Sequence, residues 1–462
     1  MDAEGMKSMK RAANLWIKFC SIETATEAIY RGTENKRTDR VVVRIFGFPG
    51  HREKSGHLDP TKVHDYAQRL ITELDEGRWQ HQPGKKRHIV SNGKDREIEI
   101  ARLKDHIVQW MAMITIQQLL TNRMYRYSVG NMPRRGIEDA RRHVEQWVRS
   151  GDCKYFVKLD IRHFYQTVKS DRLRGMVHGI IKDKRFLAVL DQIIYSAATP
   201  DPDSGCLQGL AIGYYSSPWL ANFYLSPLDR FITEDLVKQR RGKRIRIVKH
   251  CLRYVDDLLI MGNSKSDLKR AVRKIIDFAR VELDLEVKDC WEICEVGETL
   301  PPDERGRMRL KPGTKKVDIV GYTFTRTVTA VRGRSFLRLR KLARKISRDI
   351  LRKRHVSLRA VQAFVSRCGW FTHADSKHFM KLYVLPFVEP KFMQEVLSYA
   401  SKNGIVGAAA SVYCEQRKST AGRYYVLYGR AGSPARRWNG LVCSGLVHDQ
   451  LLDGRIGSKG LS

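Results

Sequence analysis

Three aspartates stand where their carboxylates could share metal ions. Asp160 ends an apolar segment that begins at Phe156, and Asp256 and Asp257 lie together in a second apolar segment, 246–262. Carboxylates brought together in such surroundings repel one another and resist desolvation, and a shared divalent cation removes that cost. Two Mg²⁺ ions about 3.5–4 Å apart stabilise the attacking and the leaving oxygen of a phosphoryl displacement. For either acidic group alone, a strand-end cap or a hairpin turn is the plainer interpretation.

The residues around these acids predict the elements that would position them. Residues 154–161 alternate in strand fashion, with Phe156, Lys158 and Asp160 on one face. Residues 246–262 predict two strands that meet at a tight acidic turn. Both predictions place an aspartate at the end of a strand.

Helices and one further hairpin are predicted around these strands. Residues 264–281 are amphipathic, and their Ser264-x-x-Asp267 start resembles a capping box. A basic, strand-like segment begins at Lys85, with Asn92-Gly93 as its turn signal. The other helical segments are 1–80 with a loop near 46–50, 104–122, 136–147 and 171–196.

The charge of the chain indicates a polyanionic partner. The 462 residues include 85 Lys and Arg against 50 Asp and Glu, which gives a net charge of +35. A folded protein with this much self-repulsion favours nucleic acid as its partner, with an acidic membrane surface as the weaker alternative. At about 100–200 residues per domain the length predicts two to four domains. The hydrophobic content of 42% excludes wholesale disorder.

No segment of the sequence is predicted to enter a membrane. Residues 204–228 carry no charge and are long enough to span a bilayer, but their Gly, Gln, Asn and Pro residues favour burial within the protein. The N-terminal residues lack the apolar stretch of a secretory signal, and nine scattered cysteines without a CxxC pair suit a reducing compartment. We therefore expect a cytoplasmic protein.

Four ordered motifs resemble those of reverse transcriptases. The palm motifs of that family are similar to 156–165 (FVKLDIRHFY), to Gln208-Gly209 followed by Ser217-Pro218, and to 254–257 (YVDD). Residues 317–322 (VDIVGY) resemble the primer-grip motif. Residues 94–109 resemble the fingers motif of bacterial members, with Ala101 where proline is usual and His106 where arginine is usual. The resemblance implies an α+β, right-hand polymerase fold with fingers, a palm built on an antiparallel sheet, and a helical thumb.

The resemblance also implies a role for each matched residue. Asp160 and Asp256 would bind two Mg²⁺ ions, with Mn²⁺ as the alternative, and Asp257 would complete the acidic cluster. Tyr165 would exclude a ribose 2′-hydroxyl by steric clash, although packing in the core would also explain it. The incoming nucleotide would contact Lys94, Arg96, Tyr165, Gln208 and Gly209, and the primer would contact Gly321 and Tyr322. For Lys94 and Arg96, a solvated strand edge is the alternative.

Two further features concern cations. Members of the family often carry a lysine after the strand near 283–285, a candidate general acid for pyrophosphate. Asp289 occupies that place here and Lys288 is one residue early; because a one-residue slip reverses the face of a strand, we assign no proton donor. Residues 332–355 contain eleven Lys and Arg and one acid, and resemble the start of the thumb.

The spacing within 332–355 separates a buried face from a basic one. Burial is predicted for Leu337, Leu339, Leu342, Ile346 and Leu351. The phosphates of a template–primer duplex would contact Arg338, Lys341, Lys345 and Arg352. A solvated basic face is the alternative.

The sequence thus predicts a helical N-terminal extension over 1–80, fingers and palm over 81–330, a helical thumb over 331–400 and a C-terminal extension over 401–462. The expected activity is copying of an RNA template into DNA from deoxynucleoside triphosphates. A dedicated non-coding RNA, an accessory protein and oligomer formation stay open as partners, and no membrane is expected.

The biological setting is open at this stage. The sequence shows neither an HNH-like Cys/His cluster nor a second acidic cluster, which favours a bacterial stand-alone enzyme. Ser217-Pro218 replaces the Ser-Gln usual in diversity-generating retroelements and favours an anti-phage defence enzyme over a retroelement or retron-like one. Two different functions compete with reverse transcription. A catalytically inactive RNA-binding relic is opposed by the intact aspartates, and an RNA-dependent RNA polymerase is opposed by Tyr165 and YVDD.

Overall fold

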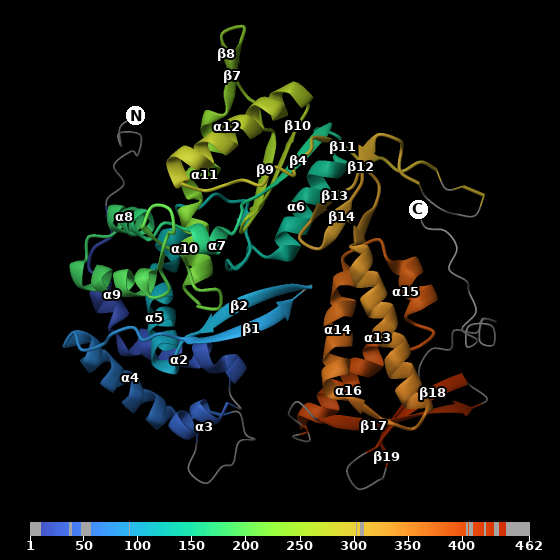
Figure 1. Ribbon diagram of the computed structural model, residues 1–462. Coiled ribbons are helices and arrows are strands. Elements are labelled where there is room, and N and C mark those ends of the chain that lie inside the picture. The colour runs from blue at the N-terminus through green and yellow to red at the C-terminus, as the bar shows by residue number, and fades with distance from the viewer. Residues whose placement is uncertain are drawn as a thin grey trace. The chain divides into compact units, whose positions relative to one another are not determined.

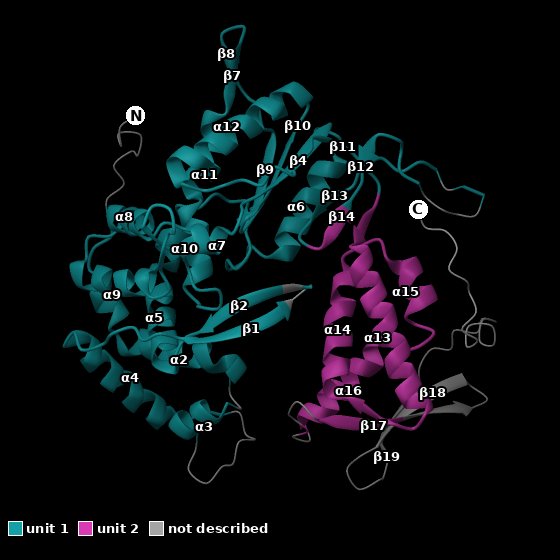
Figure 2. Cartoon of the chain, in the orientation of Figure 1, with its two compact units in different colours: residues 1–320, 324–327 teal, residues 321–323, 328–462 magenta. Residues whose placement is uncertain are grey.

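The computed structural model describes residues 11–36, 39–47, 57–91, 93–301, 303–304, 309–402, 405, 410–419, 422–428 and 434–439. The chain folds into two compact units (Figures 1 and 2). Unit 1 comprises residues 1–320 and 324–327, and unit 2 comprises residues 321–323 and 328–462.

The first part of unit 1 is helical, as predicted for residues 1–80. Ser21, Asp39 and Asp59 start three of its helices, because each side chain accepts a hydrogen bond from a backbone N–H of the first turn. The helices are α1 (Leu15–Phe19), α2 (Ile22–Thr33), a 3₁₀ turn (Glu34–Lys36), α3 (Arg40–Phe46) and α4 (Pro60–Asp75). Helices α1 and α2 pack on α5 (Leu103–Thr121), which is buried over most of its length, while α4 packs on α2 and α3 on α4. This region therefore shares one hydrophobic core with the rest of unit 1.

A six-stranded sheet forms the centre of unit 1. Its strand order is β12-β11-β4-β10-β9-β3, and the central strands β4, β10 and β9 are antiparallel. The strands are β3 (Ser128–Val129), β4 (Tyr155–Asp160), β9 (His250–Tyr254), β10 (Asp257–Gly262), β11 (Cys294–Val296) and β12 (Thr314–Lys315). Helix α12 (Lys265–Leu283) packs on β10 and β4, and α6 (Ile137–Arg149) packs on β9 and β3. The Ser264 side chain caps α12, which confirms the predicted capping residue.

Residues 171–196 are mostly helical, as predicted, but they do not form one continuous helix. They form two helices, α8 (Ser170–Ile180) and α9 (Lys184–Tyr195), because the segment between them bonds elsewhere. The Lys182 N–H donates to the Ala12 carbonyl, and the Asp183 side chain caps α9 by accepting from the Phe186 N–H.

The charge-free segment 204–228 is buried over most of its length, as predicted, but residues 204–207 are exposed. It contains β6 (Leu207–Gln208), α10 (Ser217–Tyr224) and the start of α11 (Ser226–Arg230), and every residue of α10 except Pro218 is buried. Among the described residues, no helix is both long and apolar enough to cross a bilayer. The remaining elements of this region are α7 (Phe164–Thr167), β5 (Thr199–Pro200), a π-helical turn (Phe231–Asp235), β7 (Val237–Arg240) and β8 (Lys243–Arg246).

The hairpin predicted to begin at Lys85 is present as β1 (Lys85–Ser91) and β2 (Lys94–Ile100), which pair antiparallel. Gly93 lies in its turn with φ 78°, and Asn92 lies outside the described residues. The base of β2 rests on the loop before α10, where the Glu99 N–H donates to the Ile212 carbonyl at 2.8 Å. Gly213 allows this approach: its φ is 120°, and a Cβ there would lie 2.6 Å from the Glu99 carbonyl oxygen.

Unit 2 is mainly helical, with α13 (Gly333–Leu351), α14 (Leu358–Thr372), α15 (Lys377–Tyr383) and α16 (Pro390–Lys402). A sheet in the order β16-β17-β18-β19 follows, built from His355–Ser357, Ser411–Ser419, Gly422–Tyr428 and Pro434–Asn439. Residues 440–462 of the predicted C-terminal extension lie outside the described residues. The division between the units falls in a short sheet of β13 (Val317–Ile319), β14 (Tyr322–Phe324) and β15 (Thr329–Val331).

Helix α13 corrects part of the predicted burial pattern. Leu339 and Ile346 are buried, but Leu337 and Leu351 are 56% and 58% exposed. At 3.6 residues per turn, Leu337 and Leu351 stand well away from the stripe of Leu339, Ala343, Ile346 and Ile350 that the helix buries.

Candidate active site

The tip of the β9–β10 hairpin brings acidic residues together. Tyr254 pairs with Asp257, so only Val255 and Asp256 form the loop between the strands. Val255 has φ 57°, a left-handed conformation that a β-branched residue rarely adopts, so the turn stores backbone strain. Asp257 is also the partner of Asp160 on the neighbouring strand β4. Residues opposite each other in antiparallel strands share a face of the sheet at about 5 Å, so the three predicted acids are neighbours.

The three carboxylates have few compensating partners. The Lys288 ammonium lies 2.7 Å from Asp160 Oδ2, and the Lys158 ammonium lies 3.6 Å from Asp257 Oδ1. Asp160 Oδ1 is buried and has no hydrogen-bond partner in the described part of the chain. Burial, and then repulsion by Asp160 and Asp257, raises the pKa of Asp256 above its ordinary value, against the opposing effect of a backbone hydrogen bond and Lys288. The cluster therefore holds more negative charge than its surroundings neutralise.

These features fit a divalent cation. An ion would give the orphaned oxygen of Asp160 a partner and offset the repulsion that raises the pKa of Asp256. All the donors are carboxylate oxygens, the ligand type that Mg²⁺ prefers. Asp160, Asp256 and Asp257 are thus the residues that could hold such an ion.

Lys288 is a residue of this site that the sequence interpretation missed. Ile161 pairs with Val287, and the Lys288 N–H donates to the Asp160 carbonyl, so this register sets Lys288 opposite Asp160. The hydrogen bond to Asp160 is the main effect that raises the pKa of Lys288 and keeps its ammonium charged. The inference that a one-residue slip turns Lys288 away from the site is wrong. Its orientation is set by the pairing of 286–288 with 160–162, and not by its distance in sequence from residue 285.

Tyr165 lies beside the acidic cluster. It is half-buried on α7, and its carbonyl accepts a 2.7 Å hydrogen bond from the Leu210 N–H, which ties α7 to the loop of Gln208 and Gly209. Burial, and then the charge of Asp256, raises the pKa of Tyr165. A phenol that is half-buried next to these carboxylates is available both for packing and for contact with a bound nucleotide.

Gln208 and Gly209 are held by local bonds. The Gln208 side-chain oxygen accepts from the Lys169 ammonium at 2.9 Å, and Lys169 also pairs with Asp201 and Asp284. Gly209 has φ 116°, and its N–H donates to the Val168 carbonyl. The glycine backbone is therefore fixed in a conformation that a side chain would strain.

The predicted fingers cations lie on β2. Arg96 is exposed and pairs across the hairpin with Ile89, and no ion pair of Arg96 occurs within the described residues. Lys94 begins the strand, and its side chain lies outside the described part of the structure.

The predicted primer-grip residues lie in unit 2 and are packed. Gly321 has φ 86°, and a Cβ there would come 2.4 Å from the Trp370 ring. Tyr322 is buried, stacks on Trp370 at 5.4 Å between ring centroids, and donates its hydroxyl hydrogen to the Trp370 carbonyl. The Tyr322 side chain is thus engaged in packing.

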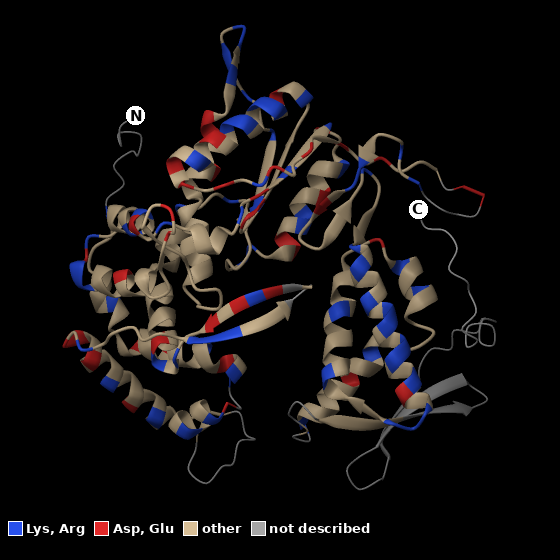
Figure 3. Ribbon diagram, viewed as in Figure 1, with Lys and Arg blue, Asp and Glu red and all other residues tan. Residues whose placement is uncertain are grey.

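Four exposed cations form a stripe on the first helix of unit 2. Figure 3 shows Lys and Arg along α13. The spacing of 338, 341, 345 and 352 keeps them within one narrow face at 3.6 residues per turn. These are the predicted nucleic-acid-binding residues Arg338, Lys341, Lys345 and Arg352, the last of which is the C-cap.

Comparison with known proteins decides the family. The family model described as "Reverse transcriptase (RNA-dependent DNA polymerase)" matches residues 84–324, more than half of the chain. The chain belongs to the reverse transcriptase family. The α+β class and the right-hand polymerase fold expected from the motifs are thereby confirmed.

Relatives of this reverse transcriptase family member include intron proteins. An uncharacterized 91 kDa protein in a cob intron of Schizosaccharomyces pombe is 26% identical over 50% of this chain and 28% of its own length. The group II intron-encoded protein LtrA of Lactococcus lactis is 25% identical over 42% of this chain and 33% of its own length. The chain thus spans about a third or less of these two relatives.

One of the solved structures that this chain distantly resembles is a telomerase. Apo telomerase from Candida tropicalis, truncated from its C-terminal domain, superposes with a TM-score of 0.39 at 14% identity, covering 58% of this chain and 60% of that one.

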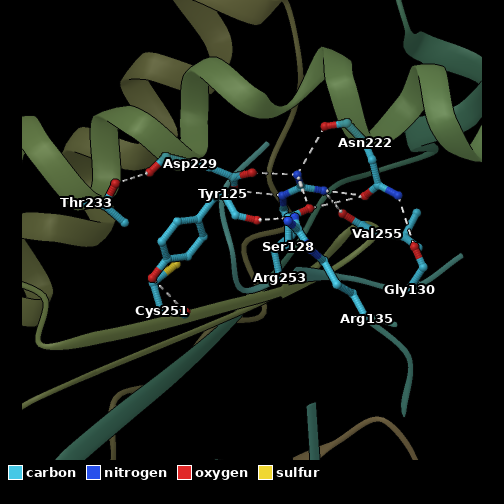
Figure 4. A network of polar contacts seen from close by, with 10 residues as sticks. All are labelled: Tyr125, Ser128, Gly130, Arg135, Asn222, Asp229, Thr233, Cys251, Arg253 and Val255. Atoms are coloured by element: carbon cyan, nitrogen blue, oxygen red, sulfur yellow. Dashed lines mark hydrogen bonds and ion pairs between the residues drawn. The ribbon is translucent and has the colours of Figure 1, made fainter. Parts of the chain in front are cut away.

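A fully buried arginine holds the acidic turn of this reverse transcriptase domain in place (Figure 4). Arg253 pairs with Asp229 through two bonds of 2.7 and 2.6 Å and donates to the Val255 carbonyl at 2.9 Å. Its remaining bonds reach Ser128 on β3 and Asn222 on α10. Arg253 thereby links the strained loop residue Val255 to α11, β3 and α10. The sequence signal was a lone arginine within an apolar strand, and the sequence interpretation did not use it.

Another group of ligand-type atoms lies at the far end of the same strands. Asp152, Cys153 and His250 could offer one atom each within 4.8 Å of one another, and no other group of this kind occurs among the described residues. Asp152 already accepts hydrogen bonds from His250 and pairs with Lys249. Burial raises the pKa of the Cys153 thiol to about 12 and keeps it protonated, which opposes metal binding.

Replacing Arg253 tests the fastening of the turn. We expect Arg253→Met to lower the free energy of unfolding by about 3–5 kcal/mol, because it leaves Asp229 charged, buried and unpaired. Urea unfolding measures the loss. Arg253→Met with Asp229→Leu should recover part of it. Arg280→Met, in an exposed pair with Asp277, is the matched control and should cost no more than about 1 kcal/mol. Equal losses in the two single variants would contradict the assigned role.

Replacing Asp256 tests the excess charge. A carboxyl with a raised pKa stabilises the folded state while protonated, below its ordinary pKa, and this contribution is lost as pH rises through the folded-state pKa. We therefore expect Asp256→Asn to raise the melting temperature of metal-free protein at neutral pH, by an amount that shrinks as pH falls. Thermal unfolding in a chelator measures this.

Mg²⁺ should reverse the order of the two proteins. Wild type should gain about 1.4 kcal/mol for each tenfold rise of Mg²⁺ above its dissociation constant, and Asp256→Asn should gain less. Asp277→Asn on α12 is the control and should follow wild type. A metal response unchanged by Asp256→Asn would refute the metal assignment.

Proposed function

We propose that the protein is an RNA-directed DNA polymerase, which copies an RNA template into DNA from deoxynucleoside triphosphates. The observation that carries the proposal is the pairing of Asp160 with Asp257 across β4 and β10, with Asp256 in the adjoining turn, inside a reverse transcriptase domain. The charge of +35 supports nucleic acid as template and product.

In the proposed reaction the acids hold two Mg²⁺ ions, or Mn²⁺ in their place. When bound, the ions make the primer 3′-hydroxyl a better nucleophile and stabilise the charge on the leaving pyrophosphate. Asp160, Asp256 and Asp257 bind and orient them. Lys288 holds a proton next to Asp160 and is the proposed donor to pyrophosphate, since its ammonium stays charged beside that carboxylate.

Other residues select and align the substrates in this proposal. Lys94 and Arg96 on β2, of which Arg96 is exposed, contact the triphosphate, and Tyr165 blocks a 2′-hydroxyl. The fixed backbone of Gln208 and Gly209 lies against the nascent base pair. The primer contacts Gly321 and Tyr322 in this proposal. The phosphates of the duplex contact Arg338, Lys341, Lys345 and Arg352. The packing of the Tyr322 ring supports a primer contact through backbone atoms at this position.

For the biological setting we propose a cytoplasmic, stand-alone bacterial enzyme of anti-phage defence, on the strength of Ser217-Pro218. The intron-encoded relatives favour a second candidate, an enzyme that works with a dedicated structured RNA. Sequencing the nucleic acid that copurifies with the protein separates the two: a single recurrent RNA supports the second, and its absence supports the first.

Primer extension tests the activity. On poly(rA)/oligo(dT), wild type should extend the primer with dTTP in the presence of Mg²⁺, and Asp256→Asn should lower the rate by at least about a thousandfold while leaving RNA binding within about twofold. RNA binding without extension by wild type would support the inactive relic instead. Preferential use of ribonucleotides would support an RNA polymerase.

Sugar selectivity tests the position of Tyr165. We expect Tyr165→Ala to lower the preference for dTTP over rTTP by at least about tenfold in kcat/KM, because the clash with the 2′-hydroxyl is removed. Tyr165→Phe keeps the ring and should keep the preference. If Tyr165→Ala selects sugars as wild type does, the residue is a packing residue only.

A further inference from the structure

We propose that the hairpin of β7 and β8, Val237–Arg246, is a second RNA-binding site. It lies away from the catalytic centre and binds the phosphate backbone of a folded RNA. We call it the basic hairpin. It contains no acid, and its cations are Lys238, Arg240, Arg241, Lys243, Arg244 and Arg246. The inference rests on the proposed function only for the presence of RNA.

The charges of the basic hairpin are exposed and mostly uncompensated. Only Lys238 forms an ion pair within the described part of the chain, with Asp267. Every residue of β8 is exposed, and so is Arg240. Arg240 pairs across the hairpin with Lys243, which sets like charges directly opposite each other, an arrangement that destabilises a strand pair. A polyanion bound here would relieve that repulsion.

The tip of the basic hairpin points to the same conclusion. Arg241 and Gly242 form a two-residue turn with φ 50° and 74°. Such turns favour Asn or Gly at the first position, because larger side chains strain a left-handed backbone. An arginine stands there instead, so the turn carries a positive charge at the expense of local stability.

The basic hairpin is separate from the acidic cluster. Its base is closed where the Ile247 N–H donates to the Leu236 carbonyl. Two residues later, the Lys249 N–H donates to the Met261 carbonyl, at the end of β10 opposite Asp257. Four residue steps along the strand, at about 3.3 Å each, place Met261 about 13 Å from Asp257. The hairpin projects from this end past α12 (Figure 1), and Figure 3 shows Lys and Arg along it. Its side chains therefore bind something other than the reacting phosphates.

The chemistry of the hairpin favours a folded RNA among anionic ligands. Four of its six cations are arginines, whose planar guanidinium groups bind phosphate with two hydrogen bonds. It contains no aromatic residue on which an unpaired base could stack, which disfavours single strands. Val237 and Ile245 are its only apolar residues, too few to insert into a lipid surface.

A four-site variant tests the site: Arg240→Gln, Lys243→Gln, Arg244→Gln and Arg246→Gln, which keeps the Lys238–Asp267 pair and the turn. The probe is an RNA stem–loop, and filter binding from 50 to 300 mM salt measures its affinity. We expect a loss of at least about tenfold near 100 mM salt. The slope of log affinity against log salt should fall by about 3–3.5 for the four lost phosphate contacts, at about 0.7–0.9 for each.

The control variant removes the same charge elsewhere in unit 1. It carries Lys182→Gln, Lys184→Gln, Lys269→Gln and Lys274→Gln, four exposed lysines before or within α9 and α12. Its binding slope should stay within one unit of wild type. Equal losses in the two variants would mean a net-charge effect only and would overturn the proposal. Unchanged stem–loop affinity in the hairpin variant would also overturn it, even if binding to anionic vesicles or to an acidic protein were lost.

Two measurements on the hairpin variant distinguish a failure of the RNA-binding proposal from a failure of the proposed polymerase function. The hairpin variant should melt at or above the wild-type temperature, because like charges are removed, and should extend oligo(dT) on poly(rA) with a kcat within about twofold. The variant Arg244→Gln with Arg246→Gln should show about half the slope change and guards against misfolding of the larger one. If wild type fails to extend primers while the stem–loop loss persists, the proposed function fails and the RNA site stands.

Discussion

The mutual repulsion of three carboxylates, two at the tip of the β9–β10 hairpin and one at the end of β4, is the constraint on which this structure depends. Asp160 and Asp257 lie opposite each other on antiparallel strands, and Asp256 follows a loop residue in a strained left-handed conformation. Left alone, such a turn would relax and separate the charges. The bonds of Arg253 to Asp229 and to the Val255 carbonyl oppose that relaxation from inside the core. The buried Arg253–Asp229 ion pair thus stabilises the turn against the repulsion between the carboxylates.

The acidic cluster and the exposed cations occupy different elements of this basic chain. The acidic cluster occupies one end of the central strands, where few cations reach it, so it favours divalent ions. Exposed cations gather on other elements, on α13 and on the hairpin of β7 and β8, where water and phosphate can reach them (Figure 3). In a chain with charge +35, the acidic cluster stays electronegative only because cations are few at that tip.

Particular residues show how far the sequence predicted the fold and the site. The alternation at 154–161 and the apolar run around YVDD predicted β4, β9 and β10, because strands with one buried face show this pattern. The break between α8 and α9 was missed, since it depends on a hydrogen bond of Lys182 to Ala12, 170 positions earlier. Leu337 and Leu351 were misplaced because hydrophobicity alone does not tell which face of α13 finds a partner.

The sequence by itself determined the types and order of the chemical groups: the carboxylates, the aromatic residue after Asp160 and the basic helix. Those are local properties, carried by composition and by periods of 2 and 3.6 residues. The tertiary structure alone decided which groups meet. Lys288 reaches Asp160 through the register of a distant segment, and Arg253 on β9 meets Asp229 only because the tertiary structure brings the Asp229 side chain of α11 to it. Pairing register and helix packing depend on contacts far apart in the chain, and no local pattern records them.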